Sequence, residues 1–162
     1  MPHRPFALPS TKIRCKQLIS QLQEALDSPA LAYSEIAGIK EQGLYLIANQ
    51  KGIIYVGKTS RSGQLRMREL TSDFRSHTLN RKLLSEHLRK KGLEIVGLTS
   101  AVKQELISAA LLTEEEFREH QVTINTHIRN RLTFRFLPIK DSSTLGRLEH
   151  FAIAVCDPLY ND

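Results

Sequence analysis

Two tyrosines, Tyr45 and Tyr55, stand ten residues apart, and each belongs to a short triplet with a glycine: Gly-Leu-Tyr at residues 43–45 and Tyr-Val-Gly at residues 55–57. Lys58 follows the second triplet directly. A phenol can position a water molecule or take its proton, but its ordinary pKa is about 10, so this role needs a nearby cation. The pattern predicts a hairpin that carries an active site, with a purely structural hairpin as the alternative.

Positive charge is concentrated just after the second triplet. Residues 58–91 hold ten basic and three acidic residues, a net charge of +7, whereas the whole chain has +6 and a pI near 9.5. The remainder therefore carries −1. Six of the ten bases are arginines, whose guanidinium groups match phosphate geometry better than lysine does. The segment predicts a face that binds a polyanion, with a solvated helix face as the alternative.

The length of 162 residues, with 41% hydrophobic and 25% charged residues, fits one soluble globular domain. No apolar run is long enough to span a membrane, and the first ten residues contain no secretory signal, so we expect a cytoplasmic protein. Cys15 and Cys156 show no disulfide or metal spacing. His120 and His127 lack a third ligand nearby, so they predict no metal site.

The hydrophobic pattern predicts an α+β fold. An amphipathic helix over 11–27, with Thr11 as its N-cap, follows a flexible arm and precedes a connector with one helical turn at 33–37. Three strands are expected at 43–48, 53–57 and 132–138, the last with Phe134 and Phe136 in the core. Further helices are expected at 64–70, 79–90, 98–112 and 143–155. A capping box at Thr113 opens another helix or continues the previous one after a bend.

These motifs, taken in order, resemble the GIY-YIG nuclease family. The triplets at 43–45 and 55–57 correspond to the two that name the family, and Lys58 occupies a position where its excision-repair members also have lysine. The segment Leu-Arg-Met-Arg at 65–68 is similar to the family's apolar-x-x-arginine motif, Arg-Leu-Glu at 147–149 to its glutamate, and Pro-Leu-Tyr-Asn at 158–161 to its closing motif.

The resemblance implies roles for six residues of the site. Glu149 would hold one Mg²⁺ or Mn²⁺ ion, and Arg68, with Arg66 as the alternative, would grip a phosphate oxygen. Tyr55 is favoured as the base and Tyr45 as its positioning partner, although the resemblance leaves that choice open. The implied catalytic set is Tyr45, Tyr55, Lys58, Arg68, Glu149 and Asn161, where Asn161 ties the end of the chain to the site.

Two features depart from the family pattern. Residues 78–131 form a long span that we expect to be an inserted helical subdomain, so the single domain of residues 1–162 divides into an arm and helix (1–41), a core (42–77 and 132–162) and this insertion. Many members of the family also place a tyrosine or histidine one helical turn after the arginine. That position is Ser72 here, or Leu70 if Arg66 is the match, and His77 in the following loop is the candidate substitute.

The implied function is a divalent-metal-dependent endonuclease that hydrolyses phosphodiester bonds in DNA. A monomer with one site should nick a single strand, so cutting both strands would require a homodimer or two encounters. A silent DNA-binding module of the same fold and a basic protein-interaction domain are the alternatives. The residues expected to contact nucleic acid are Lys58, Arg61, Arg66, Arg75, His77, Arg81, Lys82 and Arg89.

Overall fold

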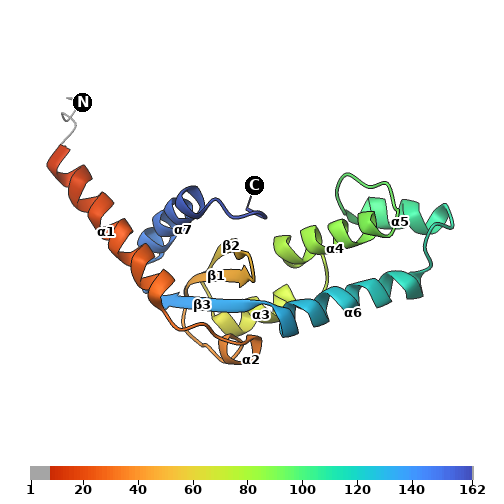
Figure 1. Cartoon of the computed structure of the whole chain (residues 1–162), viewed down its shortest axis with the longest axis horizontal. Coiled ribbons are helices and arrows are strands. Elements are labelled where there is room, and N and C mark those ends of the chain that lie inside the picture. The colour runs from red at the N-terminus through yellow and green to blue at the C-terminus, as the bar shows by residue number, and fades with distance from the viewer. Residues whose placement is uncertain (1–7, 162) are drawn as a thin grey trace.

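A three-stranded antiparallel sheet, in the order β2-β1-β3, forms the centre of the computed structural model (Figure 1), which describes residues 8–161. The predicted fold class, a small antiparallel sheet flanked by helices, is confirmed. The elements are α1 (Leu8–Asp27), α2 (Tyr33–Ile36), β1 (Gly43–Asn49), β2 (Gly52–Thr59), α3 (Gly63–Leu70), α4 (Thr78–Lys90), α5 (Ser100–Ser108), α6 (Glu114–Arg131), β3 (Thr133–Pro138) and α7 (Ser142–Cys156).

Side chains alternate along the central strand β1 and divide the core into two layers, as the two-residue period of a strand requires. Leu44 and Leu46 pack with α1 and α7 on one face. Tyr45 and Ile47 point to the opposite face, where they join the core that α2, α3, α4 and α6 cover. Both faces of the sheet are therefore buried, and the two tyrosines lie on the α3 side.

Element boundaries differ from the expected ones mainly at the start of α1 and at α5, which spans Ser100–Ser108 instead of 98–112. The helix α1 already includes Leu8, so Thr11 lies inside it and the prediction of Thr11 as N-cap is wrong. Residues 1–7 of the expected arm lie outside the described residues. Thr99 caps α5 by accepting from the Val102 N–H, and Thr113 forms the predicted capping box with Glu116 at the start of α6. Phe134 and Phe136 are buried as predicted.

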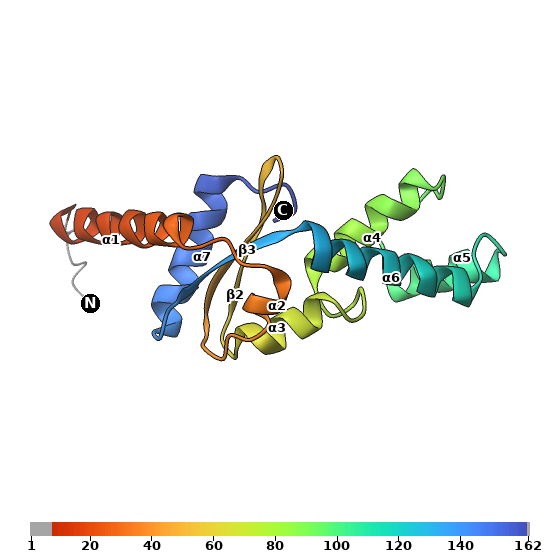
Figure 2. The same cartoon turned by 60° about the horizontal axis from the view of Figure 1, so that its bottom comes forward.

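Helices α4, α5 and α6 occupy the segment expected as an insertion and extend from one end of the sheet, whereas α1 and α7 lie at the other (Figures 1 and 2). Gly92, just past the C-cap of α4, adopts a positive φ of 92°, a conformation that glycine reaches without steric cost and that commonly ends a helix. The α4 and α6 helices pack side by side. Buried Leu84, Leu88 and Ile128 join this helical region to the same core as the tyrosines.

The C-terminal segment covers the outer edge of β2. Asn161 accepts the Val56 N–H and donates to the Val56 carbonyl, both at 2.6 Å, and the Tyr160 N–H donates to the Ile54 carbonyl. An edge strand otherwise leaves backbone groups unpaired. The last described residues thus act like a short added strand, and Asn161 ties the chain end to β2.

Two glycines make room where side chains cross between strands. Gly57 pairs with Tyr45 across β1 and β2, and a Cβ at Gly57 would lie only 2.3 Å from the Tyr45 hydroxyl. Gly43 stands against β3, where a Cβ would lie 2.2 Å from the Leu137 carbonyl oxygen. The glycine of each triplet is therefore required by close packing, and Gly57 lets the Tyr45 ring reach over the edge strand.

None of the helices within residues 8–161 is long and apolar enough to cross a membrane. Cys15 and Cys156 are both free thiols.

We predict that Gly57→Ala destabilises the protein by about 1–3 kcal/mol, because the added methyl group displaces the Tyr45 ring from a packed core. Gly97→Ala is the matched control, since a Cβ there meets no atom within 4 Å. Urea unfolding of both variants measures the effect. Equal stability of the two variants would contradict the packing role of Gly57.

Candidate active site around Tyr45

The Tyr45 hydroxyl is the buried centre of the candidate site. The side chain is completely inaccessible, and its oxygen lies 3.0 Å from Arg66 Nε and 2.9 Å from His77 Nε2. Burial raises the pKa of Tyr45 well above its ordinary value, and the Arg66 charge opposes this only in part. Tyr45 is therefore a neutral phenol at physiological pH.

The tautomer of His77 follows from its second contact. His77 is the N-cap of α4, and its Nδ1 accepts the Leu79 N–H at 3.1 Å, so in the neutral ring the proton must be on Nε2. Burial lowers the pKa of His77 to about 3, helped by the charges of Arg66 and Arg81, which keeps the ring neutral. Nε2–H therefore donates to Tyr45, whose oxygen receives two N–H groups.

Arg66 is held in place from two directions. Its Nε donates to Tyr45, and its Nη1 donates to Glu69 at 2.8 Å, one turn further along α3. Glu69 also pairs with Arg61. Although burial acts to raise the pKa of Glu69, hydrogen bonds from Arg66 and Arg61 lower it, so this carboxylate stays ionised. Glu69 was not among the expected site residues; its spacing of three from Arg66 on a helix is the signal that could have indicated it.

Arg68, the arginine favoured by the motif, does not join the tyrosines. Its side chain is exposed and lines a shallow hollow between α2, α3 and α6 together with Tyr33 and Arg129. Two residues along a helix rotate a side chain by about 200°, so Arg66 and Arg68 cannot share a face. The expectation that Arg68 lies in the site is wrong, and its alternative Arg66 lies there.

Tyr55 is stacked beside Tyr45 and reaches closer to solvent. The two ring centroids are 6.2 Å apart, and the His77 ring lies 5.3 Å from that of Tyr55. Tyr55 keeps 8% of its surface exposed, against none for Tyr45. Burial raises the pKa of Tyr55, whereas the Arg66 charge lowers it. Of the two phenols, Tyr55 is the one that a water molecule at the surface can contact.

Lys58 and Glu149 form an ion pair between β2 and α7, with Nζ 3.1 Å from Oε2. Lys58 lies near the end of β2 and Glu149 on α7, and their side chains are 42% and 17% exposed. The charge of Glu149 acts to raise the pKa of both tyrosines, so this carboxylate lies within electrostatic reach of them. Tyr45, Tyr55 and Arg66 are thus in contact with one another, and the Lys58–Glu149 pair lies within electrostatic reach of the two tyrosines.

The donor set around Glu149 fits one hard divalent cation. Within residues 8–161 no group of three histidine, cysteine, aspartate or glutamate side chains is arranged to hold a metal, so a closed protein site is absent from this range. Glu149 is a half-buried carboxylate whose described partner is a cation. A single carboxylate suits Mg²⁺, which usually keeps several water molecules and takes phosphate oxygens from its substrate.

The residues expected to contact nucleic acid fall into separate groups. Arg61 and Arg75 are exposed and paired with Glu69 and Asp73. His77, by contrast, is only 2% exposed and both of its nitrogens are engaged, so the expectation that it touches nucleic acid is wrong. Lys58 and Arg66 belong to the candidate site, and Arg81, Lys82 and Arg89 line a groove beside α4.

Two solved structures match the chain, and both are the GIY-YIG N-terminal endonuclease domain of UvrC from Thermotoga maritima. Each is a tyrosine-to-phenylalanine mutant bound to its catalytic divalent cation. The identities are 18% and 17%; both matches have a TM-score of 0.41 and cover 80% of this chain and 92% of the other. No family model and no curated protein matches the chain. Both matched structures belong to the GIY-YIG family that the motifs of this chain resemble.

We predict that His77 makes folding stability depend on pH between about 6.5 and 3. The folded pKa is lowered from 6.5 to about 3, so the unfolded chain binds the extra proton, and stability falls as the pH drops through this window. The contribution is about 1.4 kcal/mol per pH unit. His77→Asn, which keeps a residue favoured at N-caps, should lose this part of the slope in urea unfolding. Parallel pH profiles for the two proteins would refute it.

Proposed function

We propose that the protein is a divalent-metal-dependent endonuclease that hydrolyses one phosphodiester bond of DNA per encounter. The observation that carries this proposal is the buried Tyr45 hydroxyl that fixes Arg66 beside Tyr55, with the Lys58–Glu149 pair within electrostatic reach. Cations are needed to balance the charge of the phosphate as it is attacked. The site combines two cations, Arg66 and Lys58, with the phenol of Tyr55, which is the more exposed of the two tyrosines.

Each side chain has a role that its surroundings support. Arg66, oriented by Tyr45 and Glu69, grips a non-bridging phosphate oxygen, and Lys58 adds charge next to it. Tyr55 orients the attacking water, since Tyr45 is inaccessible and its oxygen is occupied. To take the proton of that water, Tyr55 must first be ionised, which the charge of Arg66 and a divalent cation on Glu149 would favour. A divalent cation on Glu149 would lower the pKa of the water and stabilise the leaving oxygen. Asn161, bonded to the Val56 backbone, keeps β2 and the chain end in register beside Tyr55.

The position of His77 weakens the case for a silent DNA-binding module. That alternative depended on the absence of a tyrosine or histidine one turn after the arginine. Leu70, one turn after Arg66, is indeed buried in the core. However, His77 enters from the next loop, donates to Tyr45 and lies against the ring of Tyr55. An imidazole therefore contacts both tyrosines although its position in the sequence differs.

Tyr55→Phe and Glu149→Gln should each reduce nicking of supercoiled plasmid by at least about 100-fold in Mg²⁺ or Mn²⁺, because each removes a proton-transfer or charge-stabilising group. Both substitutions keep the side-chain volume, so thermal unfolding should change little. EDTA should abolish nicking by the wild type. Metal-independent nicking, or full activity of either variant, would refute the proposed chemistry.

The two neighbouring arginines provide a direct comparison. Arg66→Lys keeps the charge but loses the planar group that contacts Tyr45 and Glu69 together, so we expect at least a tenfold loss of nicking rate. Arg68→Lys is the matched control and should cut at the wild-type rate, because Arg68 lies on the far side of α3. The reverse pattern would restore Arg68 as the site arginine.

A further inference from the structure

A groove beside α4 begins next to the candidate site. It has a volume of about 570 Å³ and lies between α4, the loop that joins α4 to α5, and the C-terminal segment. Arg81 stands in the first turn of α4, which His77 caps, and its charge acts on the His77 ring. Tyr160, on the other wall, is bonded to β2, the strand that contains Tyr55. The groove therefore leads directly away from the tyrosines.

The walls of the groove are held by specific contacts. Ser85 Oγ accepts the Leu98 N–H at 3.1 Å, and Arg89 donates to the Val96 carbonyl at 3.0 Å, so the α4–α5 loop is fastened to α4. On the opposite side the Tyr160 hydroxyl donates to Glu86. These hydrogen bonds attach both walls of the groove, the α4–α5 loop and the C-terminal segment, to α4.

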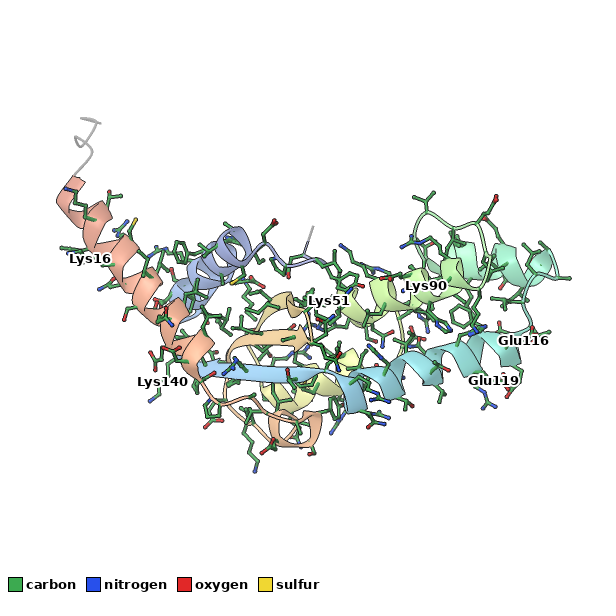
Figure 3. All side chains as sticks on the ribbon, in the orientation of Figure 1. Lys16, Lys51, Lys90, Glu116, Glu119 and Lys140 are labelled. Carbon is green, nitrogen blue, oxygen red and sulfur yellow. The ribbon has the colours of Figure 1, made fainter. Side chains whose placement is uncertain are left out.

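The charge and polarity of the lining indicate the ligand. Arg81, Lys82 and Arg89 line the groove, and no carboxylate does among the described residues. Arg81 and Arg89 lie eight residues apart on one face of α4, about 12 Å along its axis. The acidic residues Glu116 and Glu119 lie at the outer end of α6, away from the sheet (Figure 3).

Exposed apolar side chains lie next to these cations. Leu159 is 69% exposed and Val96 is fully exposed, and they line the groove from opposite walls. A duplex hides the faces of its bases and presents phosphates and sugars to such a surface, whereas an unpaired strand also presents apolar base faces. Cations together with exposed apolar groups therefore favour an unpaired strand.

We propose that this groove binds a single-stranded segment of DNA that leads to or from the bond being cut. The phosphates contact Arg81 and Arg89, and the bases pack against Leu159 and Val96. The proposal builds on the nuclease proposed above and makes DNA with an unpaired arm, such as a flap, its preferred substrate. Base contacts of this kind require no hydrogen bonding to base edges, so the groove accepts many sequences.

Binding without cleavage tests the groove directly. Fluorescence anisotropy in EDTA would compare a labelled oligothymidine with a duplex of equal length, for the wild type and for Arg81→Gln/Arg89→Gln. The plot of log K against log salt concentration has a negative slope, and each lost phosphate contact makes this slope shallower by about 0.7 for single strands. The slope of the double variant should therefore be shallower by about 1.4 than that of the wild type. Arg118→Gln/Arg131→Gln removes the same charge from exposed positions outside the groove and should retain the slope.

Leu159→Ser tests the apolar wall without changing charge. It should weaken oligothymidine binding several-fold and leave duplex binding unchanged. The proposal is overturned if the groove variants lose affinity equally for the single strand and the duplex. It is also overturned if the control pair loses as much affinity as the groove variants, or if the wild type does not bind a single strand.

Cleavage separates this proposal from the nuclease itself. If the wild type nicks plasmid but the groove variants bind oligothymidine as well as it does, the groove fails and the nuclease stands. If the wild type cuts no DNA, but single-strand binding follows the groove residues, the groove stands and the nuclease fails. If both stand, the groove variants should cut a flap substrate more slowly while they nick plain duplex at the wild-type rate.

Discussion

The buried hydroxyl of Tyr45 is the constraint on which the rest of the site depends. A phenol without solvent contact needs hydrogen-bond partners, and leaving such a group unsatisfied costs about 1–3 kcal/mol. The partners come from α3 through Arg66 and from the loop before α4 through His77. Gly57 supplies the space that lets the ring reach them across β2. One oxygen thereby fixes the relative positions of three segments far apart in the sequence.

This arrangement fixes the orientation of the Arg66 guanidinium group. Arg66 contacts a neutral phenol on one side and the ionised Glu69 on the other, so its guanidinium plane is fixed before any ligand arrives. Such preorganisation avoids the free energy of ordering a long side chain during binding. Lys58 differs, because it is nearly half exposed and pairs with a single carboxylate. The site thus combines an arginine of fixed orientation with a lysine whose ammonium group is free to move.

The sequence was sufficient to predict most helices and strands, but it could not decide which arginine of α3 faces the tyrosines. Alternation and turn residues predicted the hairpin, and the capping box at Thr113 marked the start of α6, because these signals are local. The choice between Arg66 and Arg68 depended on which face of α3 meets the sheet. Buried Met67 and Leu70 define that face, but the distance from Arg66 to Tyr45 is set by how α3 packs, which no local pattern encodes. The burial of His77 was missed for the same reason: its partner lies 32 residues away.

The same imidazole joins the site to the helical region formed by α4, α5 and α6. Nδ1 of His77 caps the first turn of α4, and Nε2 donates to Tyr45, so a single side chain satisfies a helix end and the buried phenol. A change in the direction of α4 would move the ring and break one of the two bonds. Asn80, one turn into α4, adds a second link by donating to the Leu70 carbonyl at the end of α3. The helical region α4–α6 is therefore linked to Tyr45 through His77 and to the end of α3 through Asn80, and the groove along α4 keeps a fixed orientation toward the tyrosines.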